Sequence, residues 1–241
     1  MDYASLTYPP SDAPLLEAYG GRFESLYIVL HPFVTVPEHL AWAATKQYPG
    51  DEQILSEGAK CPWAAVAAQT GIASCAKMNQ ALLTTIRSLN GEFCDFPAAD
   101  SLTNLVKSKP IWMPGEGCFE PLLQSDFLDA FESAGQETLI FVPEFPDADP
   151  IQELEVTSLQ RRETPFPGRG TLAAPDASFL FTVDWDSFFT LFYGPRQFVT
   201  EVVGRRKLEG FFATPTTEHS WYNYSLGCCV VTLAPDGWPA A

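Results

Sequence analysis

Four residues in the last quarter of the chain carry side chains that are suited to chemistry: Asp184, Asp186, Glu209 and His219. Asp184 and Asp186 are two positions apart, so on extended backbone both carboxylates face the same way. Such a pair can hold a hard cation, or one member can have a raised pKa. His219 can act as a base or as a metal ligand. The set predicts a hydrolase site of Asp184, Asp186 and His219, with or without a divalent metal, and all four residues are candidate metal ligands. The alternative is a plain turn at the surface, where Asp-x-Asp is common.

Two further side chains are candidates at the ends of predicted elements. His31 follows a continuous apolar run, and the ends of strands often carry site residues in α/β sheets, so it is a further catalytic candidate beside a structural role. Cys61 precedes a proline at a predicted helix start, where the helix dipole lowers the pKa of a thiol. Simple packing is the alternative for Cys61. Cys228 and Cys229 are predicted to be two thiols, because a disulfide between neighbours is strained.

The sequence lacks the motifs that identify common reactions. It has no G-x-S-x-G, no C-x-x-C and no P-loop, and Gly168-Arg169-Gly170 has neither P-loop nor Rossmann spacing. We therefore expect no cofactor.

The charge balance indicates which partners the chain can attract. The 241 residues include 14 basic and 30 acidic residues, which gives a formal net charge of -16. A field of this sign repels nucleic acids and anionic membranes and steers a basic protein partner toward the surface. The simpler interpretation is that the charge only keeps the protein soluble. Nothing in the sequence indicates an oligomeric state.

The N-terminus and the apolar segments favour a cytoplasmic protein. No basic region followed by an apolar run stands at the start of the chain. The uncharged stretch from Cys61 to Ala76 is too short and too weakly apolar to span a bilayer.

The hydrophobic patterns predict an α+β fold, with one domain over residues 1–241 and helices packed on a mixed or antiparallel sheet. A helix-rich part is expected over about 37–135, and a strand-rich part over about 137–233. The predicted strands are 26–30, 138–142, 178–183, 187–193, 208–213 and 221–233. The predicted helices are 14–18, 37–47, 62–69, 74–89, 126–133 with Ser125 as its cap, and 196–206. Segments 96–117 and 161–175 are predicted to be irregular.

Residues 184–221 resemble a group of known sequences. The segment reads Asp-Trp-Asp-Ser-Phe-Phe-Thr-Leu-Phe-Tyr-Gly, continues through a predicted helix, and includes Leu-Glu-Gly-Phe-Phe and His-Ser-Trp-Tyr. It resembles uncharacterised bacterial α+β domains, some of them found among toxin-immunity proteins. The resemblance implies a small binding domain and carries over no catalytic residue.

Three functional hypotheses follow. The first is an acidic protein-binding module, in its finer form an immunity protein that blocks a basic bacterial toxin. The charge and the missing motifs favour this non-enzymatic hypothesis. The second is a small hydrolase that uses Asp184, Asp186 and His219, with or without a divalent metal. The third is a structural subunit, which would form a fixed oligomer.

Overall fold

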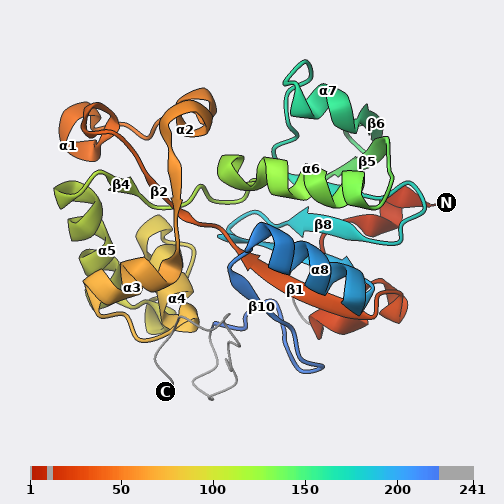
Figure 1. Ribbon diagram of the computed structural model, residues 1–241. Helices are drawn as coiled ribbons and strands as arrows, with labels where there is room; N and C mark the ends of the chain where they lie inside the picture. Colours follow the sequence, from red (N-terminus) through yellow and green to blue (C-terminus); the bar gives the residue numbers. More distant parts are fainter. Residues whose placement is uncertain (1, 10–12, 223–241) are drawn as a thin grey trace. The chain divides into compact units, whose positions relative to one another are not determined.

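A computed structural model describes residues 2–9 and 13–222 of the chain (Figure 1). Two compact units are distinguished by their internal contacts. Of the described residues, the first unit contains 2–9, 13–29, 116–119 and 123–219, and the second contains 30–115, 120–122 and 220–222. Each unit is described by itself, and the expectation of one domain stays a prediction.

The first unit contains a seven-stranded sheet with the order β10-β1-β9-β8-β7-β5-β6. Its strands are β1 (Ser25–Leu30), β5 (Thr138–Pro143), β6 (Gln152–Glu155), β7 (Gly170–Ala173), β8 (Leu180–Val183), β9 (Phe189–Gly194) and β10 (Gly210–Phe212). Antiparallel pairing joins β10 to β1, and it also joins the successive neighbours from β9 to β6. This sheet and the helices packed on it confirm the α+β class.

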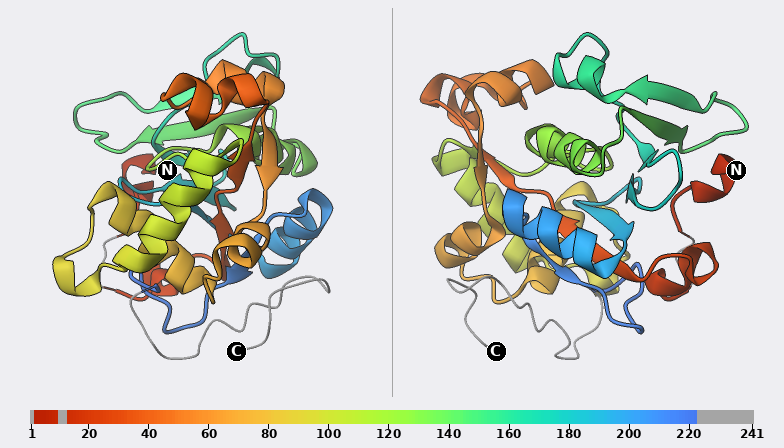
Figure 2. Two further views of the ribbon diagram at one scale, coloured as in Figure 1. Left: turned by 90° about the vertical axis from the view of Figure 1, so that its left-hand side faces the viewer. Right: turned by 45° about the vertical axis from the view of Figure 1, so that its right-hand side comes forward.

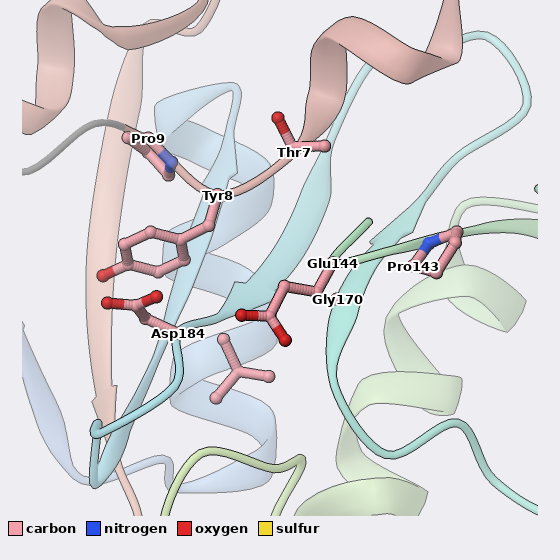
Figure 3. Close-up of a pocket in the computed structure, with 8 residues that line it drawn as sticks. Thr7, Tyr8, Pro9, Pro143, Glu144, Gly170 and Asp184 are labelled. Carbon is pink, nitrogen blue, oxygen red and sulfur yellow. The ribbon is translucent and has the colours of Figure 1, made fainter. Parts of the chain in front are cut away.

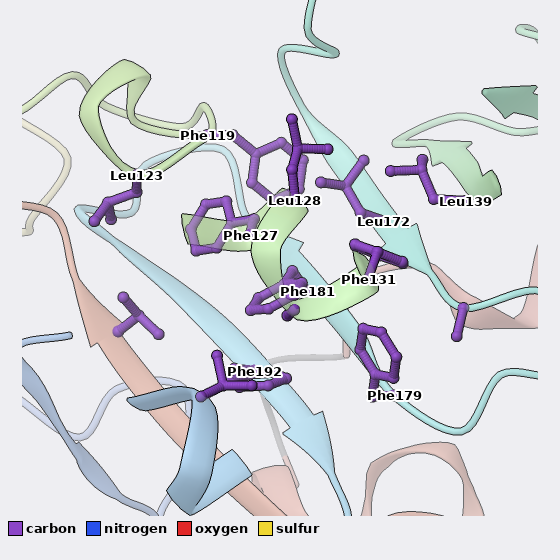
Figure 4. Close-up of a cluster of buried hydrophobic side chains, with 14 of the residues drawn as sticks. Phe119, Leu123, Phe127, Leu128, Phe131, Leu139, Leu172, Phe179, Phe181 and Phe192 are labelled. Carbon is purple, nitrogen blue, oxygen red and sulfur yellow. The ribbon is translucent and has the colours of Figure 1, made fainter. Parts of the chain in front are cut away.

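Phenylalanine side chains form the core on one face of this sheet (Figure 4). Phe181 on β8 stacks on its cross-strand partner Phe192 with ring centroids 4.2 Å apart. Phe127 from the helix α6 (Gln124–Ser133) lies 4.6 Å from the Phe181 ring. Aromatic pairs of this kind add stability beyond the area that they bury.

Two helices cover that face side by side (Figure 2). They are α6 and α8 (Arg196–Arg206), and α8 buries Val199 and Val202. Arg206 donates to the buried carboxylate of Asp126 on α6 at 2.7 Å, which links the polar sides of the two helices. A short helix, α7 (Val156–Gln160), follows β6.

The N-terminal segment of the first unit packs around Tyr193, on the opposite face of the sheet. Two 3-10 helices form here, Tyr3–Leu6 and Leu15–Gly21. The buried Tyr193 of β9 donates a hydrogen bond to the carbonyl of Leu15 at 2.9 Å, and its ring meets Tyr19 edge-on at 5.2 Å. The segment is thereby tied to the sheet.

The second unit combines a three-stranded antiparallel sheet with helices. The sheet order is β3-β2-β4, formed by β2 (Phe33–Thr35), β3 (Ala59–Cys61) and β4 (Ile111–Trp112). The helices are α1 (Trp42–Thr45), α2 (Asp51–Glu57), α3 (Trp63–Thr70), α4 (Cys75–Ile86) and α5 (Phe96–Ser108), with 3-10 turns at Glu38–Leu40, Gly91–Phe93 and Pro121–Leu123. A smaller core forms around Val34, Ile54, Val106 and Trp112.

The irregular segment predicted over 96–117 is wrong, because α5 occupies most of it. The prolines suggested a broken chain, but Pro97 lies in the first turn, where its missing N–H costs nothing. The Asp95 side chain caps the helix by accepting a hydrogen bond from the Ala98 N–H at 3.2 Å. Leu102 and Leu105 then bury the apolar face.

The surface loop predicted over 161–175 is wrong in its second half. Residues 170–173 form β7, a buried strand between β5 and β8. The surrounding Pro, Gly and Arg residues masked a strand of only four residues. Pairing with two neighbouring strands, which no local pattern reveals, decides this conformation.

Several predicted element ends also differ. The helix expected over 37–47 is a 3-10 turn followed by the one-turn α1, and the helix expected to reach residue 89 ends at Ile86, with Arg87 in the left-handed conformation at φ 61°. Ser125 does not cap α6, because the helix already begins at Gln124 after the preceding 3-10 turn. The strand predicted over 221–233 and the pair Cys228-Cys229 lie outside the described residues, apart from Trp221 and Tyr222, which are in a turn.

Within residues 2–9 and 13–222, no helix is long and apolar enough to cross a membrane.

Candidate functional site

The main candidate site is a pocket of the first unit, with a volume of about 320 Å³ (Figure 3). It lies at one end of three paired strands, where Pro143 of β5 pairs with Gly170 of β7, and Gly170 pairs with Val183 of β8. The N-terminal segment supplies the opposite wall. We call this the acidic pocket, and its lining residues are Thr7, Tyr8, Pro9, Pro143, Glu144, Gly170, Val183 and Asp184.

Two glycines allow the backbone to approach closely here. Gly170 has φ 137°, and a Cβ atom at this position would collide with the carbonyl oxygen of Val142. Gly117 has φ 59°, and a Cβ atom there would collide with the carbonyl oxygen of Trp185. The Gly117 N–H also donates to the Ser187 carbonyl at 2.9 Å. Segment 116–119 is thus held against the turn that follows β8.

Carboxylates concentrate at this pocket. Glu144 and Asp184 line it. The charge of Asp184 acts on Asp186, and the charge of Asp186 acts on Glu116. Burial raises the pKa of Asp186, and the negative charge of Asp184 raises it further. Burial also raises the pKa of Glu116, with a second contribution from Asp186. In both groups burial is the larger cause, and repulsion by a neighbouring carboxylate is the second.

Arg169 supplies positive charge to the group. Its Nη1 lies 3.2 Å from Glu144 Oε2, and its Nε donates to the Gly117 carbonyl at 2.6 Å. The guanidinium carbon lies 4.5 Å from the ring centroid of Trp185, whose residue surface is 57% exposed. One guanidinium therefore serves three carboxylates, Glu144 by an ion pair and Glu116 and Asp186 by its charge, which lowers the pKa of both.

His219 joins the pocket residues Tyr8 and Asp184. The hydroxyl of Tyr8 lies 2.9 Å from His219 Nδ1, and His219 Nε2 lies 3.5 Å from Asp184 Oδ2. Burial lowers the pKa of His219, and the charge of Asp184 opposes that shift. With Nε2–H directed at Asp184, Nδ1 is free of a proton and accepts the Tyr8 hydroxyl.

Backbone bonds to the N-terminal segment hold His219 in place. Leu15 N–H donates to the Thr217 carbonyl at 2.8 Å, and Pro14 forms an isolated bridge with Glu218. The His219 ring also meets the Tyr8 ring edge-on at 5.5 Å. The histidine is consequently fixed relative to the pocket wall.

The structure brings three of the four predicted residues together. Asp184, Asp186 and His219 lie at this site, with Asp184 and Asp186 in a turn where the Asp184 carbonyl accepts the Ser187 hydroxyl at 3.1 Å. Glu209 precedes β10. Among the described residues, no group of three or more His, Cys, Asp and Glu side chains is placed to hold a metal ion.

The other two predicted residues belong to the second unit. His31 is fully buried, and this burial lowers its pKa to about 3, against a hydrogen bond with the Gly115 backbone. It is neutral at physiological pH. Cys61 is buried at the end of β3, just before the start of α3.

Sequence reasoning missed Tyr8, Glu144, Arg169 and Glu116. Tyr8 and His219 are separated by 211 positions, so no local spacing could connect them. Arg169 stood between two glycines in a predicted loop, and Glu144 directly follows a predicted strand. The position at a strand end was the available signal for Glu144.

Comparison with known proteins identifies the family. Residues 11–223 match the family described as "Protein of unknown function (DUF2711)", and the chain belongs to this family. It is similar to the "Uncharacterized protein YwbB" of Bacillus subtilis (strain 168), with 24% identity over 235 residues that cover 92% of this chain and 99% of the relative. The resemblance to uncharacterised bacterial proteins is thereby confirmed. No solved structure matches the chain.

Proposed function

We propose that this member of the DUF2711 family binds a basic protein, and that its acidic pocket receives a Lys or Arg side chain of that partner. The observation that carries the proposal is the concentration of carboxylates at this pocket. Glu144 and Asp184 line it, the charge of Asp184 acts on Asp186, and that of Asp186 acts on Glu116. Arg169 is a cation that acts on Glu144, Asp186 and Glu116. Burial is the main cause of the raised pKa of Asp186 and Glu116, and a cation in the pocket would relieve the repulsion between carboxylates that adds to it.

The shape of the pocket supports a side chain as its occupant. A volume of about 320 Å³ is at the lower end of the range for ligand pockets. The Tyr8 ring lies in the wall close to the Asp184 carboxylate (Figure 3), so an ammonium or guanidinium would meet both an aromatic surface and a negative charge. The net charge of -16 would steer a basic partner toward the protein from a distance.

The finer form of the proposal is an immunity protein. Its partner would be a basic bacterial toxin, and binding would block the toxin surface sterically. This form is supported by the sequence resemblance of residues 184–221 to uncharacterised bacterial domains, some of them found among toxin-immunity proteins.

The test is a pull-down of the tagged full-length chain from a lysate of its source cells, eluted by a salt gradient. The pocket variant Glu144→Gln/Asp184→Asn is compared with Asp147→Asn/Asp149→Asn, two exposed carboxylates on the loop after β5. Both variants change the net charge equally. We expect a basic partner that wild type and the loop variant retain, and that the pocket variant releases at lower salt.

If both variants retained the basic partner equally well, the acidic pocket would not be its binding site. Release that does not depend on salt would contradict the electrostatic mechanism altogether.

A second candidate function rests on the Tyr8–His219–Asp184 chain of contacts. In a small hydrolase, neutral His219 would accept the Tyr8 hydroxyl proton while the Tyr8 oxygen takes a proton from the attacking water, and Asp184 would stabilise the imidazolium that forms. The depressed pKa of His219 supports this role, because the neutral form that can accept a proton is the one present at pH 7.

Tyr8→Phe separates the two functions. The substitution keeps the ring that would face a cation and removes the hydroxyl proton. If the protein is a hydrolase, turnover of a model ester such as p-nitrophenyl acetate falls at least about 100-fold in Tyr8→Phe and in His219→Ala. If it is a binding protein, Tyr8→Phe retains the basic partner like the wild type, and ester turnover is no faster than in buffer.

A further inference from the structure

A second pocket, in the second unit, differs in chemistry from the acidic pocket. It has a volume of about 300 Å³ and is formed by α1, the loop after it, α5 and β4. We call it the aromatic pocket, and the lining residues used below are Trp42, Tyr48, Val106, Lys107, Trp112 and Met113.

The walls of the aromatic pocket are fixed by the fold. Trp112 belongs to β4, where it pairs with Val34 of β2, and its indole N–H donates to the Leu40 carbonyl at 2.9 Å. The Tyr48 ring meets Trp112 edge-on at 5.4 Å, and 39% of the Tyr48 surface is exposed. The pocket thus has an anchored aromatic floor and an accessible aromatic rim.

Two lysines give this pocket a positive edge. Lys46 Nζ lies 3.8 Å from the Trp42 ring centroid, and Lys107 Nζ lies 5.7 Å from the same centroid. Lys46 also donates to the Ala43 carbonyl at 3.2 Å. Within the part of the chain that the structure describes, neither ammonium is paired with a carboxylate. Two cations beside one ring, in a chain of net charge -16, form a local site for an anion.

We propose that the aromatic pocket binds a small molecule in which a planar aromatic ring carries a carboxylate. The ring would pack among Trp42, Tyr48 and Trp112, and the carboxylate would meet Lys107 and Lys46. Apolar walls with a few charged groups that fix orientation are typical of small-molecule sites, and the volume suits a ligand of one or two rings. The negative field of the rest of the protein disfavours anions elsewhere, so the lysine pair determines where such a ligand binds.

Three probes of equal size test the charge requirement. Isothermal titration calorimetry on the full chain compares 2-naphthoate with 2-naphthylmethanol and 2-naphthylmethylamine. We expect the carboxylate to bind roughly tenfold more tightly than the alcohol, and the amine to bind most weakly. Lys46→Met/Lys107→Met should remove the preference for the carboxylate while the alcohol still binds. Lys109→Met, an exposed lysine just after α5, is the control and should leave all three affinities unchanged.

Other outcomes overturn the proposal. Equal affinities for the carboxylate and the alcohol, or a double variant that retains the preference, would show that the lysines do not select an anion. No binding of any probe would show that the pocket is not a ligand site. Binding of a peptide that ends in phenylalanine, without binding of 2-naphthoate, would assign the pocket to a protein C terminus.

Discussion

The two pockets have similar volumes, about 320 and 300 Å³, but opposite chemistry. The acidic pocket is built on the ends of three paired strands and is lined by carboxylates and a tyrosine hydroxyl. The aromatic pocket is built on α1, the loop after it, α5 and β4, and is lined by two indole rings, a tyrosine and a lysine. Although the net charge of the chain is -16, each pocket has its own local charge, so the overall charge does not predict what each one binds.

The largest effect is expected from a substitution in the core beneath β8, the strand at whose end the acidic pocket lies. Phe181→Ala removes a ring that contacts both Phe192 and Phe127 beneath β8, the strand that carries Val183 and leads to Asp184. We expect the free energy of unfolding to fall by about 3–5 kcal/mol, measured by urea denaturation.

Phe145→Ala is the matched control, because Phe145 follows Glu144 and 58% of its surface is exposed. It should change the free energy of unfolding by less than about 0.5 kcal/mol. Similar losses in the two variants would mean that the phenylalanine core does not support this end of the sheet.

The second prediction contrasts the partly exposed carboxylates of the acidic pocket with Glu120, which is completely buried. Glu120 Oε2 accepts the Gly115 N–H at 3.1 Å, while Oε1 has no hydrogen-bond partner among the described residues. Burial raises the pKa of Glu120 from 4.5 to about 7. Because the folded-state pKa is the higher one, this stabilisation is complete below about pH 4.5 and is lost as the pH rises through about 7.

Glu120→Gln removes this titration and keeps an oxygen for Gly115. Between pH 5 and pH 8 the wild type should lose roughly 2.5 kcal/mol more unfolding free energy than the variant, measured by urea denaturation at each pH. His31 acts with the opposite sign, because its lowered pKa removes stability as the pH falls from 6.5 toward about 3. Parallel pH profiles in the wild type and Glu120→Gln would show that this carboxyl is not desolvated in the folded protein.

Much of the fold could be predicted from local patterns. The continuous apolar run of β1 and the succession β8, β9, α8, β10 agree with the sequence, because turn residues separate elements that each bury an apolar face. Segment α5 and strand β7 could not be predicted in the same way. In α5 the cap outweighed the prolines, and in β7 the two neighbouring strands determined the conformation of four residues.

The candidate site likewise contains residues that the sequence predicted and residues that it could not predict. Asp184 and Asp186 were identified by their spacing of two positions, and His219 was identified as a base or ligand in a nearby turn. Tyr8 comes from the other end of the chain and meets His219 only after the N-terminal segment has folded against the sheet. Two residues so far apart in the sequence form no local spacing pattern from which their contact could be predicted.

The central claim is that charge located in the acidic pocket, and not net charge alone, selects a basic partner. The most direct measurement is the affinity of an arginine-rich tetrapeptide for Glu144→Gln/Asp184→Asn and for Asp147→Asn/Asp149→Asn, by calorimetry at low salt. Both variants carry the same net charge. We predict that the pocket variant binds roughly tenfold more weakly than wild type, while the loop variant differs by less than about twofold. Equal weakening in both variants would show that only net charge matters, and would contradict the pocket as the binding site.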